Sequence, residues 1–430
     1  MNARVFVIIL LGSAVGSASA SHERPSGRFL SSSGSSVEDL VDAALAREPG
    51  MQALRRQVDA ARGRARQAAL RPNPTLTLSR NEEIGGTDNN TLVGFAWPLD
   101  LSRKSARVAT AERETEVARA EILDLERLLA ADVRRGAGEV LAAVRSLRVA
   151  EDLLEASRRF AELVDARVRE GAAPALERGL LGVEISRIET DLVLGEARAE
   201  RALLEVKRLS GLMPDAELTL REDLERLIGP GGAERSSTAH EARPDVRAAD
   251  ARVASAEARR DLAGTSGRSD ASLIAAYSRM DAGFPQSGFG PVGGIERVRA
   301  VFHRVDFGVS WELPIRNRNQ GEVQAMDAER TAAQQEAVRA RLVAATDLAS
   351  AEVREEKGIE ALSLYRRGVL DQARENLNVL RESYVLGRSA LLDVIAEERR
   401  YLEAERGYTE VLLEVYQARV DLKSARGEAR

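Results

Sequence analysis

Apolar residues recur every three or four positions along the proline-free segment between Pro98 and Pro174. From Ile122 to Leu147 arginine and glutamate fill the positions between them. This spacing is the period of an α-helix with one apolar face. Because proline breaks helix interiors, its absence predicts one helix that fills most of this interval, about 105 Å long for some 70 residues. A second proline-free run follows Pro314 and predicts further long helices that pack as coiled coils.

Strict alternation of apolar and polar residues marks four shorter segments, and this pattern is typical of half-buried strands. The segments form two pairs, and each pair brackets a turn-rich loop, the second loop at 283–294. We therefore expect two β-hairpins, at about 75–99 and about 271–313. The residues expected to share one face of these hairpins are Leu76, Leu78, Phe95, Trp97, Phe307, Val309 and Trp311.

The order of helix, hairpin and long helices occurs twice, which indicates an internal duplication. Residues 94–99 match residues 308–313 at an offset of 214. The duplication predicts a first repeat at 37–228, a linker rich in glycine, proline and serine at 229–238, and a second repeat at 239–430.

The N-terminus has the features of an export signal. A positive charge at Arg4 precedes a short apolar run, and Ala18-Ser19-Ala20 is a small-residue cleavage site. We interpret residues 1–20 as a signal peptide, with an uncleaved N-terminal anchor as the alternative. Residues 21–36, rich in serine and glycine, are expected to form a flexible lead-in.

The composition excludes several chemistries. The chain has no cysteine, and its three histidines lie far apart in sequence, so we expect no metal site and no cofactor. A net charge of −5 gives no electrostatic basis for binding nucleic acid. The G-x-G-x-x-G pattern at 288–293 contains a proline and precedes a strand-like run, so it indicates a hairpin loop instead of a dinucleotide site. With only 4% aromatic residues, the chain is not expected to be an enzyme.

Three motifs in this order resemble the TolC-like outer-membrane efflux factors over essentially the whole mature length. They are Arg71-Pro72-Asn73-Pro74, the run from Arg243 to Ala249, and the run from Tyr384 to Val394. The stretch from Leu313 to Gly321 is similar to the cobalt–zinc–cadmium efflux branch of that family.

The resemblance implies a mixed α/β membrane protein, mostly α, with four β-strands per chain. Three chains would form a homotrimer whose twelve strands make an outer-membrane barrel in contact with lipid, continued by a coiled-coil tunnel through the periplasm. The implied function is a passive duct that works with a periplasmic adaptor and an inner-membrane pump of the RND type, exporting heavy-metal cations. Alternatives are a duct for drugs or for protein secretion, or a coiled-coil scaffold.

The resemblance also implies where the adaptor docks and where the duct closes. The docking tip would include Gly171, Pro174, Tyr384, Gly387, Arg388 and Ser389. Asp393 matches an acidic ring that constricts the closed duct, and Glu177 occupies the corresponding place in the first repeat. Ala396 stands where a second gate acid often occurs, so Glu397 is a candidate substitute. The alternative for Asp393 is a carboxylate that stabilises the start of a helix.

Overall fold

The computed structural model describes residues 24–84, 88–229 and 242–428. The long helices and the two hairpins follow one another in the order that the helical and alternating patterns predict, and β1 is an additional short strand. The signal peptide, residues 21–23 and most of the linker at 229–238 lie outside the described residues. The elements are η1 (Pro25–Arg28), β1 (Leu30–Ser35), α1 (Val37–Arg47), α2 (Pro49–Ala69), β2 (Thr75–Glu82), β3 (Asn89–Pro98), α3 (Lys104–Arg169), α4 (Ala175–Leu209), α5 (Leu224–Ile228), α6 (Pro244–Ser266), β4 (Asp270–Phe289), β5 (Ile295–Glu312), α7 (Gln320–Leu364), a π-helical segment (Tyr365–Val369), α8 (Leu370–Val385) and α9 (Leu391–Ala425).

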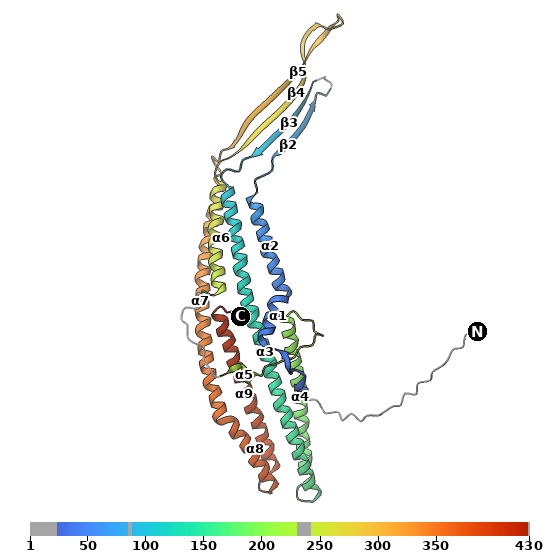
Figure 1. Cartoon of the computed structure of the whole chain (residues 1–430), viewed down its shortest axis with the longest axis vertical. Helices are drawn as coiled ribbons and strands as arrows, with labels where there is room; N and C mark the ends of the chain where they lie inside the picture. Colours follow the sequence, from blue (N-terminus) through green and yellow to red (C-terminus); the bar gives the residue numbers. More distant parts are fainter. Residues whose placement is uncertain (1–23, 85–87, 230–241, 429–430) are drawn as a thin grey trace, which may run out of the picture.

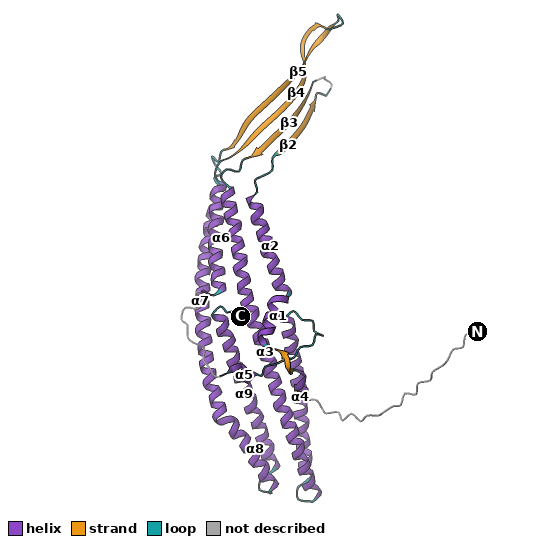
Figure 2. Ribbon diagram, in the orientation of Figure 1, coloured by secondary structure: helices purple, strands orange, loops and turns teal. Residues whose placement is uncertain are grey.

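The molecule is elongated, with the sheet at one end and two helical tips at the other (Figures 1 and 2). Helix α3 is 66 residues long and runs the length of the helical part. Helices α2, α6 and α7 accompany it toward the sheet, and α4, α8 and α9 accompany it toward the tips. In the part of the chain that the structure describes, no helix combines the length and the apolar character needed to cross a membrane.

The main core lies midway along the helices, where α1, α3, α5 and α9 meet. Val140, Val144 and Leu147 of α3 pack here with Leu412 and Val415 of α9, and all five are almost completely buried. Burying a leucine or valine contributes about 1.5–3 kcal/mol. This core fixes α9 against the middle of α3.

The described part of the lead-in is ordered, so the expected flexible segment at 21–36 is wrong for residues 24–36. Phe29 is 3% exposed and belongs to the main core. Ser26 donates to Glu151 at 2.6 Å, and the Leu220 amide donates to the Phe29 carbonyl at 2.9 Å. Ser26 therefore has a buried polar partner on α3, and Phe29 anchors the segment in the core.

The sheet is antiparallel with the order β2-β3-β4-β5, so the two hairpins lie side by side. Strands β4 and β5 are much longer than the alternation predicted. Residues 283–289, expected in a loop, belong to β4, and the turn occupies only 290–294. Pairing between the backbones continues past a register irregularity between Gly283 and Ser287. The ladder of hydrogen bonds thus overrides the weak strand preference of glycine.

Candidate functional site: the two-faced sheet and the helical tips

The two faces of the sheet differ in chemistry. Residues paired across strands share a face, and the register places Leu76, Phe95, Ala275 and Phe307 in one row. We call this side the apolar face. It comprises Leu76, Leu78, Val93, Phe95, Trp97, Leu273, Ala275, Tyr277, Val305, Phe307, Val309 and Trp311. All seven hairpin residues named from the sequence lie on it.

The apolar face is uncovered within the single chain. Phe307 is 83% exposed and Leu78 is 70% exposed. The opposite face carries mainly small or polar residues, among them Thr77, Gly94, Ala276 and Asp306, which form one row. A contiguous apolar patch of this kind marks a surface that contacts a membrane or a partner.

Two glycine turns reverse the chain at the end of the molecule opposite the sheet. Gly171 joins α3 to α4 with φ of +76°, and Gly387 joins α8 to α9 with φ of +72°. A left-handed backbone favours glycine at both positions. Pro174 precedes α4 and is exposed, and Ser389 donates to the Leu380 carbonyl at 3.2 Å. These turns form the surface of the tips.

Tyr384 is not part of that surface, contrary to the expectation that it docks a partner. Its side chain is 3% exposed and packs edge-on against Phe160 of α3, with ring centroids 5.3 Å apart. The Tyr384 hydroxyl donates to Glu177, and Arg167 donates to the Tyr384 carbonyl and covers its ring at 4.8 Å. We call Arg167, Glu177 and Tyr384 the tip latch, because they join the α3–α4 tip to the α8–α9 tip. Burial, and then Glu177, raise the pKa of Tyr384 to about 12.

The remaining candidate residues of the tips have distinct environments. Asp393 is exposed in the first turn of α9 and accepts a hydrogen bond from the Ala390 amide at 3.2 Å. Glu397, one turn later, is 5% exposed and pairs with Arg400 at 3.0 Å. Arg388 is exposed and, among the described residues, makes no ion pair. In the single chain, therefore, Asp393 stands open to solvent and Glu397 does not.

Two buried carboxylates that the sequence did not single out lie farther along the bundle. Glu398 of α9 is 1% exposed, accepts from Ser157 of α3, and lies 3.2 Å from Arg381 of α8. Its Oε2 atom has no hydrogen-bond partner among the residues that the structure describes. Glu184 of α4 is equally buried and pairs with Arg399 at 2.7 Å. Burial raises the pKa of Glu398, and the charge of Glu184 adds to this, while Ser157 and Arg381 oppose it.

Replacing Glu398 with glutamine is expected to stabilise the helical bundle at neutral pH. Because the pKa of Glu398 is raised in the folded protein, its stabilising contribution is present at low pH and is lost as the pH rises through the folded pKa. A charged oxygen left without a partner costs about 1–3 kcal/mol. Glutamine keeps the acceptor for Ser157 without the charge, so the thermal midpoint of E398Q should exceed that of the wild type at pH 7.5.

The advantage of E398Q should disappear near pH 4, where the wild-type side chain is protonated. Glu403→Gln, an exposed change on the same helix, is the control and should leave the midpoint unchanged at both pH values. A lower midpoint for E398Q at pH 7.5 would instead mean that the ion pair with Arg381 outweighs the burial of the charge.

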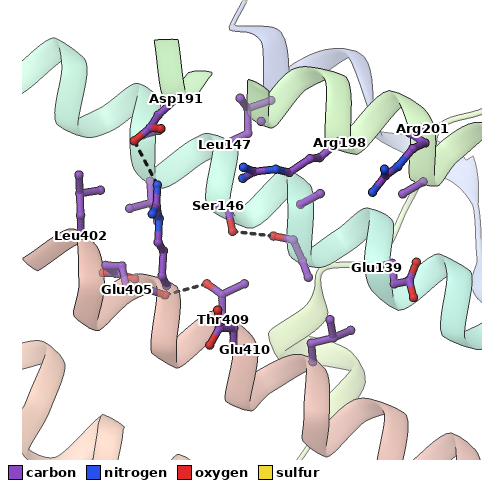
Figure 3. Close-up of a pocket in the computed structure, with 18 of the residues that line it drawn as sticks. Glu139, Ser146, Leu147, Asp191, Arg198, Arg201, Leu402, Glu405, Thr409 and Glu410 are labelled. Atoms are coloured by element: carbon purple, nitrogen blue, oxygen red, sulfur yellow. Dashed lines mark hydrogen bonds and ion pairs between the residues drawn. The ribbon is translucent and has the colours of Figure 1, made fainter. Parts of the chain in front are cut away.

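A hollow of about 440 Å³ opens between α3, α4 and α9 (Figure 3). Its lining mixes alanine and leucine with charged residues, and the ion pair between Asp191 and Arg406, 3.1 Å long, crosses from α4 to α9. Arg198 and Arg201 reach toward it from α4. Within the described residues, no three histidine or acidic side chains gather to hold a metal ion. The hollow is a groove between three helices.

The sequence matches a known protein family and a characterised relative over most of its length. The family model described as outer membrane efflux protein matches residues 40–211 and 236–428. The cobalt-zinc-cadmium resistance protein CzcC of Cupriavidus metallidurans is 24% identical over 369 residues, which cover 86% of this chain and 84% of CzcC.

Solved structures share the fold at low sequence identity. The crystal structure of CusC superposes with a TM-score of 0.76 at 18% identity, over 93% of each chain. The open state of the MtrE outer membrane channel of Neisseria gonorrhoeae gives a TM-score of 0.73 at 20% identity, over 91% of this chain and 89% of MtrE.

Proposed function

The chain belongs to the outer membrane efflux protein family, and from that premise we propose that it is the passive outer-membrane duct of a tripartite system exporting heavy-metal cations. Its fold is that of the TolC-like channels. The observation that carries the proposal is the two-faced sheet at the end of long helices. An apolar outer face suits lipid, and a small or polar inner face suits a water-filled passage.

The free edges of the sheet support assembly as a trimer. In the described residues, β2 and β5 each pair on one side only. An open edge exposes unpaired backbone groups, and closure into a barrel removes it. Four strands cannot close a barrel, and an eight-stranded barrel is filled by its own side chains. Three copies supply twelve strands and leave room for a duct.

The helical tips supply the surface for an adaptor in this proposal. The turns at Gly171 and Gly387 lie at the end farthest from the sheet, and with the sheet in the outer membrane they point into the periplasm. Arg388, exposed and without an ion pair among the described residues, offers a guanidinium that binds a carboxylate or carbonyl partner. An inner-membrane pump of the RND type supplies the energy, and the duct itself consumes none.

Asp393 is the acid we propose for the constriction of the duct. It is exposed at the start of α9, and three-fold symmetry would repeat it as a ring. A ring of carboxylates attracts cations and repels anions. Glu177 is engaged by Tyr384 and Glu397 by Arg400, so both are weaker candidates for such a ring.

Deleting the gene in its host is expected to lower resistance to cobalt, zinc and cadmium ions and to leave resistance to hydrophobic drugs unchanged. The similarity to CzcC and the run from Leu313 to Gly321 support this cargo. The measurement is growth inhibition across a metal series and a drug series. Complementation with the wild-type gene should restore resistance, and complementation with Asp393→Asn should restore less of it.

Asparagine at 393 separates the two roles open to this residue. It keeps an acceptor for the Ala390 amide but carries no charge, so a purely capping role predicts full restoration by Asp393→Asn. Loss of drug resistance with metal resistance intact would reassign the cargo to drugs. Intact resistance in both series would contradict the efflux proposal.

A further inference from the structure

The apolar face of the sheet ends at one row of residues paired across the four strands, and this row contains two arginines. The row consists of Arg80, Thr91, Arg279 and His303. The adjacent row on the same face, nearer the helices, is Leu78, Val93, Tyr277 and Val305. All four strands therefore change from apolar residues to basic or polar ones at the same level.

Tyr277 marks this level as the edge of an apolar layer. Its ring belongs to the apolar face, while its hydroxyl lies 2.7 Å from Nδ1 of His303 in the next row. An aromatic ring with a polar end is characteristic of the boundary between lipid and water. Trp311 lies on the same strand as His303, about 27 Å away along the extended backbone. In a barrel whose strands are tilted by about 40°, this length spans roughly 20 Å along the barrel axis, close to the ~25 Å height of the apolar band of outer-membrane proteins.

Arg279 is the uncompensated cation of this row. It is exposed and, among the described residues, makes no ion pair. Arg80 pairs with Glu82 at 2.6 Å, and Arg299 pairs with Asp281 at 3.3 Å. The acid closest to Arg279 along its own strand, Asp281, is thus already engaged by another arginine.

We propose that Arg279, whose neighbours in the row are Thr91 and His303, binds the phosphate groups of lipids in the outer leaflet. The inference rests on the proposed function, which puts the apolar face in the membrane and the long β4–β5 hairpin toward the exterior. A guanidinium donates two parallel hydrogen bonds to a phosphate. Cations placed just beyond an apolar layer are attracted to anionic headgroups. Because no acid among the described residues pairs with Arg279, a headgroup is its complementary partner.

The test is native mass spectrometry of the detergent-solubilised full chain, titrated with phosphatidic acid. Arg279→Gln is expected to weaken binding about five-fold, the effect of removing one basic residue from a lipid contact. The matched control is Arg304→Gln. Arg304 neighbours His303 on β5 but occupies the opposite face, in the row of Ser79 and Ser278, so its loss should leave binding unchanged.

Three outcomes would overturn the inference. They are equal weakening by R279Q and R304Q, equal affinity of the wild type for phosphatidylcholine, and displacement of the lipid by millimolar inorganic phosphate. The last outcome would assign the site to free phosphate. A second measurement distinguishes failure of the headgroup site from failure of the proposed function. It is insertion into vesicles, monitored by the fluorescence emission of Trp97 and Trp311. A chain that inserts but shows no lipid preference refutes only the headgroup site, and a chain that never inserts refutes the duct.

Discussion

Placing arginine at Phe307 is expected to destabilise the membrane-inserted protein by about 2–4 kcal/mol, the cost of a cation near the middle of the bilayer on the lipid side of a barrel. Phe307 is 83% exposed on the apolar face, with apolar rows on both sides of its own. No acid lies in those rows to pair with the new charge.

The control for Phe307→Arg is Ser310→Arg. Ser310 lies on the same strand but pairs with Ser272 on the opposite face, which the proposal assigns to the water-filled passage. The two tryptophans of the chain, Trp97 and Trp311, both lie on the apolar face, so their emission reports insertion directly. Denaturant titration in vesicles gives the free energy of unfolding. Equal losses in the two variants would contradict the assignment of the faces, and equal tolerance would contradict a lipid-facing surface.

Truncating Tyr384 to alanine is expected to cost about 3–5 kcal/mol locally and to loosen the two tips from each other. Loss of a buried aromatic ring accounts for that magnitude. Tyr384 contacts Phe160 and Arg167 of α3 and Glu177 of α4, so its removal breaks the tip latch and its packing together. If the latch holds the duct closed, channels formed by Tyr384→Ala in planar bilayers should also conduct more than the wild type.

Tyr384→Phe isolates the hydrogen bond from the packing. The ring stays against Phe160, and only the bond from the hydroxyl to Glu177 is lost, which costs about 1.5–3 kcal/mol for a charged acceptor. Hydrogen exchange of the amides in the two tips measures the loosening. Because the pKa of Tyr384 is raised to about 12, the hydroxyl keeps its proton, and the latch its donor, throughout the physiological range. Wild-type exchange and conductance in both variants would contradict a latch.

The amino-acid sequence by itself determined where the long helices and the two hairpins lie. The spacing of apolar residues carries that information, because a long proline-free run with a helical period strongly favours an α-helix. Helix α3 continues through this run for 66 residues. Alternation likewise fixed the side of the sheet on which Phe95, Phe307 and Trp311 lie, since successive side chains of a strand point to opposite faces.

The sequence spacing did not predict where β4 and β5 end or that residues 24–36 are ordered. Both depend on contacts with other segments of the chain. Strands β4 and β5 extend each other through glycine-rich segments, because each backbone supplies the hydrogen bonds that the other needs. Phe29 becomes ordered only where α1, α3 and α9 have formed a core to receive it.

Only the tertiary structure decided which polar residues of the tips are exposed to solvent and which are buried. Tyr384 and Glu398 are polar residues of the C-terminal helices, yet both are buried, because residues of α3 and α4 contact them. Asp393, nine residues from Tyr384, is exposed, although Leu391 and Val394 of the same first turn of α9 are buried. Local periodicity defines the faces of one helix, but burial depends on neighbours that are more than 200 residues away in sequence.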